Sequence, residues 1–358
     1  MAKNINITDD MDLTKEIYDP VLLRKLVYKK YSEEDLIKEL REFAETKLNP
    51  YAINSRGKST NLLMIHFFRE VQYKAKVESS KYTPDEILDH PDELKKVYEY
   101  LKTKPRVFNH EYPVDNLIHW YSNNRNTAGR VGNFSPVTAR KIYESSMPKF
   151  NATIYDYSCG FGARMLGCLA SQYNYKYLGT DPNSELFVSL NKFAPFVCDN
   201  LDRGRDYDIR CQGSEVFVPE WENTVDMSFS SPPYFTMELY SDDEGQSVNK
   251  YKEYDAWVKN YVQGTLNNIY RYTKKGGIHA VNLKNTDGKR MLEDWCLCAL
   301  RAGFKLKRFE KINGEEGFLV KKMAHQSQRN FGKRDENGKL HRFNYEAGYE
   351  PIVYFVKE

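Results

Sequence analysis

The fold of this chain is best predicted from residues 152–162, Ala152-Thr153-Ile154-Tyr155-Asp156-Tyr157-Ser158-Cys159-Gly160-Phe161-Gly162. The first four of these residues are apolar or β-branched and predict a strand, and a helical pattern follows at 164–171. Glycines at a turn from strand to helix let the backbone approach a ligand, and the helix N-terminus adds a favourable dipole. We therefore predict a ligand site at Gly160 and Gly162. The alternative is a tight turn that binds nothing.

The next predicted strand, Lys176–Thr180, ends at Asp181, nineteen residues after Gly162. An acid at the tip of the second strand of such a sheet is placed to hold ribose hydroxyls. A dinucleotide and S-adenosylmethionine both carry an adenosine ribose, so this spacing alone leaves both cofactors open. A dinucleotide site usually has a third glycine that lets the helix pack over the pyrophosphate, and Met165 stands there instead. This difference favours a cofactor without a pyrophosphate.

Beyond residue 132 the chain alternates strand and helix patterns, which predicts an α/β fold with a doubly wound, mostly parallel sheet. Strands are predicted at 152–155, 176–180, 207–211, 225–229 and 277–283, with two late strands at 305–309 and 352–356. Helices, such as 164–171 and 254–273, fall between them. Helical periodicity before the sheet predicts an N-terminal helical region, residues 1–105, followed by a polar connector, 106–132. The main domain would then span 133–358.

A double proline follows the predicted strand 225–229, in the sequence Ser230-Ser231-Pro232-Pro233-Tyr234-Phe235. Two consecutive prolines are stiff and donate no backbone hydrogen bonds, so they fix a loop whose carbonyls point one way. Such a carbonyl and a serine before it can accept hydrogen bonds from an exocyclic amine. The nitrogen lone pair is then aimed at an electrophilic methyl group, and Tyr234 offers a stacking face to an extruded base. The alternative is a rigid turn with a packed tyrosine.

With these motifs the chain resembles the amino-methyltransferases, S-adenosylmethionine-dependent enzymes that methylate exocyclic amines of DNA bases. The glycine motif Asp156–Gly162, the acidic strand tip Asp181 and the catalytic motif Ser231–Tyr234 carry the resemblance. It covers roughly residues 130–300 and the last strand. It implies a class I methyltransferase-like fold, S-adenosylmethionine as the cofactor, no metal, and DNA as a partner.

The resemblance also implies residue roles. Cofactor contacts are expected from Asp156, Ser158, Gly160, Gly162 and Asp181. The segment Asn133-Phe134-Ser135-Pro136 is similar to the one that contacts the methionine part, which makes Phe134 and Ser135 candidates. A serine cap with proline in the first helical turn suits that position independently. Ser214 stands where the family commonly places an adenine contact, and whether Ser214 or Glu215 touches the ring stays open.

The implied reaction is direct methyl transfer, without a covalent intermediate or a metal. Ser231 and the Pro232 carbonyl would orient the amine, Pro233 would stiffen the corner and Tyr234 would stack on the base. The serine form of this motif is associated most with N4 of cytosine, so cytosine is favoured over N6 of adenine. The open alternatives are an RNA or protein amine methyltransferase, and an inactive nucleic-acid-binding module of the same fold.

Only about 70 residues separate Gly162 from Ser231, too few to hold a target-recognition domain as well as the predicted strands and helices. A basic excursion at about 313–347 suits duplex phosphates, with Lys333, Arg334 and Arg342 as possible contacts. The polar segment 237–254 is expected to form a lid-like loop over the active site.

The composition is consistent with a globular protein of 358 residues, since 41% of them are hydrophobic and 29% charged. The net charge of +3 is too small to indicate a nucleic-acid partner by itself. No apolar run approaches the ~20 residues that span a bilayer, and the first residues do not resemble a secretory signal. The six cysteines show no disulfide rhythm. We therefore expect a cytoplasmic protein that is not bound to a membrane.

Overall fold

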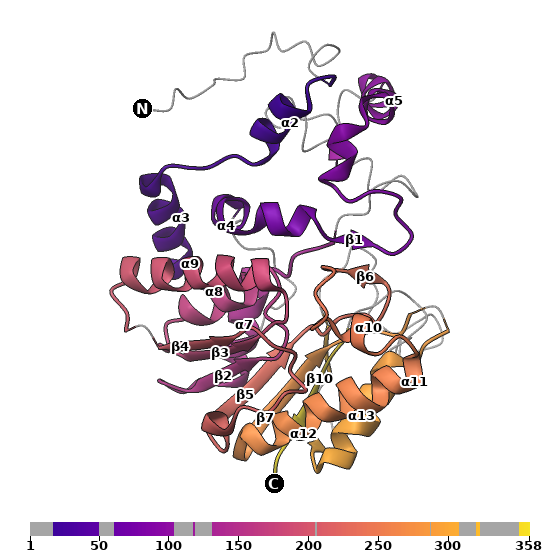
Figure 1. Cartoon of the computed structure of the whole chain (residues 1–358). Coiled ribbons are helices and arrows are strands. Elements are labelled where there is room, and N and C mark those ends of the chain that lie inside the picture. Colours follow the sequence, from indigo (N-terminus) through magenta and orange to yellow (C-terminus); the bar gives the residue numbers. More distant parts are fainter. Residues whose placement is uncertain are drawn as a thin grey trace, which may run out of the picture.

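The structure is a computed structural model that describes residues 17–49, 61–103, 117–118, 131–204, 206–286, 288–307, 320–322 and 351–358. Within them, eight strands form one central sheet (Figure 1). These strands are β2 (Thr153–Asp156), β3 (Lys176–Thr180), β4 (Tyr207–Arg210), β5 (Val225–Ser230), β7 (Thr273–Asn282), β8 (Lys305–Leu306), β9 (Val320–Lys322) and β10 (Pro351–Val356).

The strand order is β4-β3-β2-β5-β7-β10-β8, and β9 also pairs with β10. The strands from β4 to β7 are mutually parallel, whereas β10 is antiparallel to β7, β8 and β9. The chain runs from β2 outward to β3 and β4 on one side, then to β5 and β7 on the other. The winding direction therefore reverses between β2 and β5. This order confirms the predicted doubly wound, mostly parallel sheet.

The predicted strands agree closely with the observed ones. The segment Lys176–Thr180 is strand β3 as predicted, and β5 extends the predicted 225–229 by one residue. The largest difference is in β7, which begins at Thr273 rather than at Gly277. Thr273 pairs with Val225 across an irregularity in the register, and this pairing lengthens the strand beyond its apolar pattern.

Helices cover both faces of the sheet (Figure 1). One face carries α7 (Pro136–Ser146), α8 (Ala163–Leu169) and α9 (Ser184–Asn200), and the other carries α12 (Gln263–Tyr272) and α13 (Met291–Ala302). Two hydrophobic clusters result, one on each side. The first contains Ile154 and Met227, and the second contains Trp257 and Trp295. Burial of both faces is what a parallel sheet requires.

Helix α7 begins as the sequence predicts. The Ser135 hydroxyl accepts a hydrogen bond from the Thr138 amide at 3.3 Å, and Pro136 is the first helical residue. The same arrangement starts α3 (Glu33–Glu45), where Ser32 accepts from the Asp35 amide at 3.2 Å. These caps satisfy amides that have no partner within the helix.

Most of the described residues of the N-terminal region are helical. It comprises α2 (Pro20–Val27), α3, α4 (Asn61–Tyr73), the short 3-10 turn Glu86–Asp89 and α5 (Pro91–Lys102). Helices α3 and α4 bury side chains such as Phe43 and Phe68 in the cluster that includes the sheet. In contrast, α2, the 3-10 turn and α5 share a separate cluster with Leu117 and Ile118. Helices α3 and α4 are therefore continuous with the main core, whereas α2 and α5 pack in a cluster of their own.

The segment after β5 is joined to the N-terminal region. Strand β1 (Lys76–Val77) pairs antiparallel with β6 (Glu238–Leu239), and the Glu78 amide donates to the Met237 carbonyl at 2.9 Å. Figure 1 shows this ribbon between the N-terminal helices and the sheet. Among the described helices, none combines the length and apolar character needed to cross a bilayer.

Candidate functional site

The candidate site lies where the winding of the sheet reverses. Ligands of doubly wound sheets bind beyond the carboxyl ends of the strands at such a reversal. Here the reversal falls between β2, which leads into the glycine loop 157–162, and β5, which leads into the diproline corner 231–234. The Ser230 hydroxyl donates to the Ser158 carbonyl at 3.3 Å. The glycine loop is therefore in direct contact with the residue that precedes the diproline corner.

The buried side chain of Tyr157 also connects the glycine loop to the end of β5. Tyr157 is buried, and its hydroxyl donates to the Ala280 carbonyl of β7 at 3.0 Å and lies 3.5 Å from the Ser230 carbonyl. Its ring stacks on Trp295, with centroids 5.5 Å apart. The floor beneath the site is thus tied to three neighbouring strands, so its geometry is fixed by the core.

The glycine loop adopts the conformation that its glycines allow. Gly160 and Gly162 have φ angles of +55° and +69°, in the left-handed region that favours glycine. A β-carbon on Gly160 would meet only Arg164 at 3.4 Å and a carbonyl at 3.9 Å, so the space above Gly160 is largely open. A β-carbon on Gly162 would lie 2.2 Å from the Phe68 ring of α4. Gly160 thus leaves room for a ligand, whereas Gly162 makes room for the N-terminal region.

Asp181 is placed at the tip of β3 as predicted. Its carboxylate accepts hydrogen bonds from the Gly160 amide and the Asn183 amide, each at 3.1 Å. Burial raises the pKa of Asp181 to about 6, and the two amide donors oppose that shift. The side chain therefore bridges the glycine loop and the start of α9, at the position where ribose hydroxyls would lie.

Asp156 is placed differently from Asp181, because it faces the interior. It is fully buried, and its carboxylate accepts hydrogen bonds from Arg164 at 2.9 Å and from the Tyr177 hydroxyl at 3.1 Å. Arg164 also donates to the Ser158 carbonyl. Asp156 therefore holds the glycine loop through Arg164. Sequence reasoning did not single out Arg164, because an arginine in an apolar helical pattern gives no sign that it is buried.

The segment before α7 lies against the glycine loop. The Asn133 side chain donates to the Phe161 carbonyl at 3.2 Å. The Arg164 guanidinium lies over the Phe134 ring, 5.6 Å from its centroid, and the ring is also 5.6 Å from Phe229 of β5. Phe134 and the exposed Ser135 are therefore at the same edge of the sheet as the glycine loop.

The loop after β4 contains the two candidates for an adenine contact. Ser214 is buried, its hydroxyl is 2.7 Å from that of Thr265, and its carbonyl accepts from the Asn268 amide group at 3.0 Å. Glu215 pairs with Lys250 through one carboxylate oxygen at 2.7 Å. The other carboxylate oxygen of Glu215 is buried and has no hydrogen-bond partner. Glu215 is thus the candidate that retains a free acceptor.

The diproline corner forms a partly exposed rim. Ser231 and Pro233 are partly exposed, Pro232 is buried, and Tyr234 is 8% exposed. Phe235 has a φ angle of +52°, which is strained for a residue with a side chain. Its ring packs against Tyr254 and Trp257, with both centroid distances 5.5 Å. This packing holds the strained turn, so the corner is rigid.

The segment 237–250 crosses the tips of β3 and β4. Asp243 accepts hydrogen bonds from the amide and the hydroxyl of Ser184, at 3.3 and 3.1 Å. A β-carbon on Gly245 would lie 3.0 Å from Pro182, so the backbone packs closely there. The Lys250 pair with Glu215 fixes the far end of the segment. This course agrees with the predicted lid-like loop, although the loop is anchored at several points.

One side chain that the sequence did not indicate also faces the site. Tyr261 lies in a π-helical turn, Val258–Val262, between α11 (Tyr254–Trp257) and α12. Its hydroxyl is 3.5 Å from that of Ser158. The sequence predicts one uninterrupted helix over 254–273, and an α-helical pattern does not indicate a π turn.

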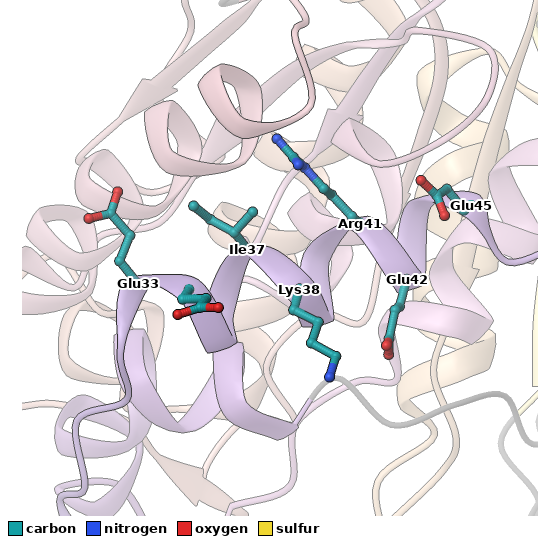
Figure 2. A pocket seen from close by; sticks show the side chains of 7 residues that line it. Glu33, Ile37, Lys38, Arg41, Glu42 and Glu45 are labelled. Carbon is teal, nitrogen blue, oxygen red and sulfur yellow. The ribbon is translucent and has the colours of Figure 1, made fainter.

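Two other features can be placed relative to the site. A hollow beside α3 is lined by side chains of that helix alone, including Ile37, Lys38 and Arg41 (Figure 2). No strand end reaches it and its charges are mixed, so it is not a candidate active site. Lys333, Arg334 and Arg342, the possible DNA contacts, lie outside the described residues. Over the described ranges, no group of three or more potential metal-ligating side chains comes together.

No protein-family model matches the chain, and no curated protein matches its sequence. Among solved structures, the chain is similar to a TehB-like SAM-dependent methyltransferase from Corynebacterium glutamicum, with 15% identity, a TM-score of 0.38, and coverage of 63% of this chain and 90% of that one. A methyltransferase from Pyrococcus furiosus is similar with 15% identity and a TM-score of 0.36, and the match covers 62% of this chain and 82% of that one. TrmN from Thermus thermophilus is similar with 13% identity and a TM-score of 0.37, and the match covers 63% of this chain and 50% of that one. Similarities at this level say nothing about the function of this chain. Its strand order identifies the fold.

Proposed function

We propose that this protein transfers a methyl group from S-adenosylmethionine to an exocyclic amino group of a DNA base, with N4 of cytosine favoured over N6 of adenine. The observation that carries the proposal is the hydrogen bond between Ser230 and Ser158. It joins the last residue of β5, directly before the diproline corner, to the glycine loop at the reversal of the sheet. A methyl donor in the loop and an amine at the corner would then be neighbours.

The residues around the glycine loop fit an adenosine-containing cofactor. The open space above Gly160 admits a ligand close to the backbone, and Asp181 offers a carboxylate at the ribose position. The unpartnered oxygen of Glu215 can accept a hydrogen bond from the adenine amino group. We therefore assign the adenine contact to Glu215 rather than to Ser214, whose hydroxyl is bonded to Thr265. When bound, the cofactor supplies an electrophilic methyl group on a sulfonium.

The diproline corner would orient the amine. Ser231 is partly exposed, and its hydroxyl can accept a hydrogen bond from the amino group together with the Pro232 carbonyl. Both acceptors stabilise the positive charge that develops on the nitrogen during transfer. Tyr234 would stack on the base after its extrusion from the duplex. The fixed Phe235 turn keeps these groups in place before the substrate arrives, so little reorganisation is needed.

The decisive experiment combines methyl-labelled S-adenosylmethionine with the full-length protein and with double-stranded DNA, RNA or protein substrates. We expect label in DNA, and mass spectrometry of the digested nucleosides should detect N4-methylcytosine. The Ser231→Ala variant serves as the control for contaminating activity. Label only in RNA or only in protein would overturn the DNA assignment. Cofactor binding without label in any substrate would instead identify an inactive binding module.

A further inference from the structure

The helical segment from Val258 to Tyr272 holds the loop after β4 along one of its faces. Thr265 and Asn268 bond Ser214, as described above. Next to Thr265, the Cα of Gly264 lies so close to Glu215 that an added β-carbon would be 3.1 Å from its Cβ. The position of the loop is therefore set by this helical face.

Tyr261 differs from the other residues of this face because it also reaches the glycine loop. It is 3% exposed, and its hydroxyl lies 3.5 Å from that of Ser158. Burial keeps the pKa of Tyr261 well above its ordinary value, so the phenol stays protonated and can donate. Tyr261 therefore joins this helical face to the glycine loop.

The direction of this contact follows from the acceptors. The Ser158 hydroxyl donates to the Tyr157 carbonyl at 2.7 Å, so it accepts from Tyr261. The same helical segment bonds Ser214 through Thr265, 2.7 Å away, and through Asn268. The segment therefore connects the glycine loop, through Tyr261, to the loop after β4.

We propose that Tyr261 is a positioning residue for the cofactor, whose hydroxyl fixes the spacing between the glycine loop and the loop after β4. The proposal rests on the proposed function, because those two loops are the ones expected to hold the nucleoside. Without the Tyr261 hydroxyl the glycine loop loses its contact with this helical segment, which still holds Ser214. The two loops can then move apart.

The test is calorimetric titration of S-adenosylmethionine and S-adenosylhomocysteine into the wild-type protein and the Tyr261→Phe variant. The loss of one hydrogen bond predicts a Kd that rises by about 3- to 10-fold for both ligands. The maximal methylation rate at saturating cofactor should stay within about twofold, because Tyr261 does not touch the amine in this arrangement. Thr265→Val, which removes the bond of the same helical segment to the Ser214 hydroxyl, should raise the Kd in the same direction.

The matched control is Tyr272→Phe. It removes a buried hydroxyl from the same helical segment, but that hydroxyl accepts from the Val218 amide at 2.6 Å, away from the site. Its Kd should equal that of the wild type. If both Tyr261→Phe and Thr265→Val keep the wild-type Kd, the positioning role of Tyr261 is overturned, but the proposed function is not. No binding of either ligand by the wild-type protein would overturn the proposed function and this inference with it.

Discussion

The hydroxyl of Ser230 and the carbonyl of Ser158 are 3.3 Å apart, although the two residues are 72 positions apart in the sequence. This contact crosses the reversal of the sheet between β2 and β5. In the proposed function the two halves of the site have different tasks, because Ser158 belongs to the loop expected to hold the cofactor and Ser230 precedes the corner expected to hold the amine. Substitutions on the two sides should therefore have different kinetic effects.

Ser231→Ala should lower the maximal rate and leave cofactor binding intact. The hydroxyl would act only on the amine as charge develops, and loss of one such group costs on the order of 10²-fold in kcat. Ser230→Ala should have the opposite effect, a KM for cofactor raised severalfold with kcat nearly unchanged, because it releases the glycine loop. Steady-state kinetics with both variants measure this. An equal loss of kcat in both would contradict the division of tasks.

Cofactor affinity should fall as the pH decreases through about 6. Asp181 is ionised above its raised pKa of about 6, and in the proposed function the carboxylate then accepts hydrogen bonds from ribose hydroxyls. Below that pH the carboxyl carries a proton and offers fewer hydrogen-bond acceptors to the ribose. The Kd for the cofactor should therefore increase by up to tenfold per pH unit. Titrations from pH 5 to pH 8 measure the dependence.

The Asp181→Asn variant is the control for this titration. It cannot ionise, so its Kd should be higher at pH 8 and flat across the range. The substitution should have the opposite effect on the stability of the fold, which it should not lower at pH 8. A desolvated carboxylate with a raised pKa destabilises the native state above that pKa, and the asparagine does not ionise. The ligand-free variant should therefore unfold at an equal or higher temperature at pH 8. A wild-type Kd that does not change between pH 8 and pH 5 would refute the role given to this carboxylate.

The basic excursion predicts a salt effect on DNA binding. Replacing Lys333, Arg334 and Arg342 together by alanine should weaken binding and flatten its dependence on salt. Each lost phosphate contact lowers the slope of log K against log salt by about 0.9, hence by up to about 2.7 for three contacts. Fluorescence anisotropy across a salt series measures the slope. An unchanged slope would remove these residues from the DNA interface.

The sequence predicts the sheet well, and it also predicts that the motifs follow neighbouring strands, because both depend on local patterns. The turn after β2, the acid ending β3 and the diproline after β5 are each encoded within a few consecutive residues. Once the strands are parallel, their carboxyl ends meet at one edge, so the motifs converge. The predicted strand β3 and the Ser135 cap are found as expected for the same reason.

Features that depend on distant contacts could not be predicted in this way. The pairing of Lys76–Val77 with Glu238–Leu239 involves two residues on each side, too few to give an alternating pattern. The π turn at Tyr261 is not marked by any particular residue type in the sequence, yet it brings a side chain close to Ser158. The close approach of Phe68 to Gly162 is also hidden, because the glycine alone suggests a ligand contact.

That approach predicts different outcomes for two similar substitutions. Gly162→Ala should reduce the free energy of unfolding by about 2–4 kcal/mol, from backbone strain at positive φ and from overpacking against Phe68. Gly160→Ala faces open space and should cost only the strain, about 1–2 kcal/mol. Gly160→Ala should nevertheless weaken cofactor binding more, because its methyl group enters the ligand space. Urea unfolding and calorimetry together separate the two effects.

Phe68→Ala provides the control for the packing argument. In the double variant with Gly162→Ala, the new methyl group no longer meets the ring, so the combined loss should be smaller than the sum of the single losses. Strict additivity would show that the ring does not limit position 162.

His279 should make the protein sensitive to acid. It is fully buried in β7, where it accepts from the Trp295 indole at 3.1 Å and contacts the Ser228 hydroxyl at 2.9 Å. Burial lowers the pKa of His279 from 6.5 to about 3. In the unfolded chain the imidazole binds a proton below about pH 6.5, whereas in the folded protein it stays neutral. Stability from this residue is therefore complete above pH 6.5 and is lost as the pH falls toward 3.

The His279→Gln variant isolates this contribution, because an amide of similar size can accept from Trp295 but does not titrate. We expect the variant to be less stable than the wild type at pH 7, where the imidazole is well packed. The difference should narrow on acidification, by up to about 1.4 kcal/mol per pH unit between pH 6.5 and 3. Urea unfolding at pH 7, 6 and 5 measures it. A difference that stays constant over that range would mean that His279 is protonated in the folded protein or that its burial is incomplete.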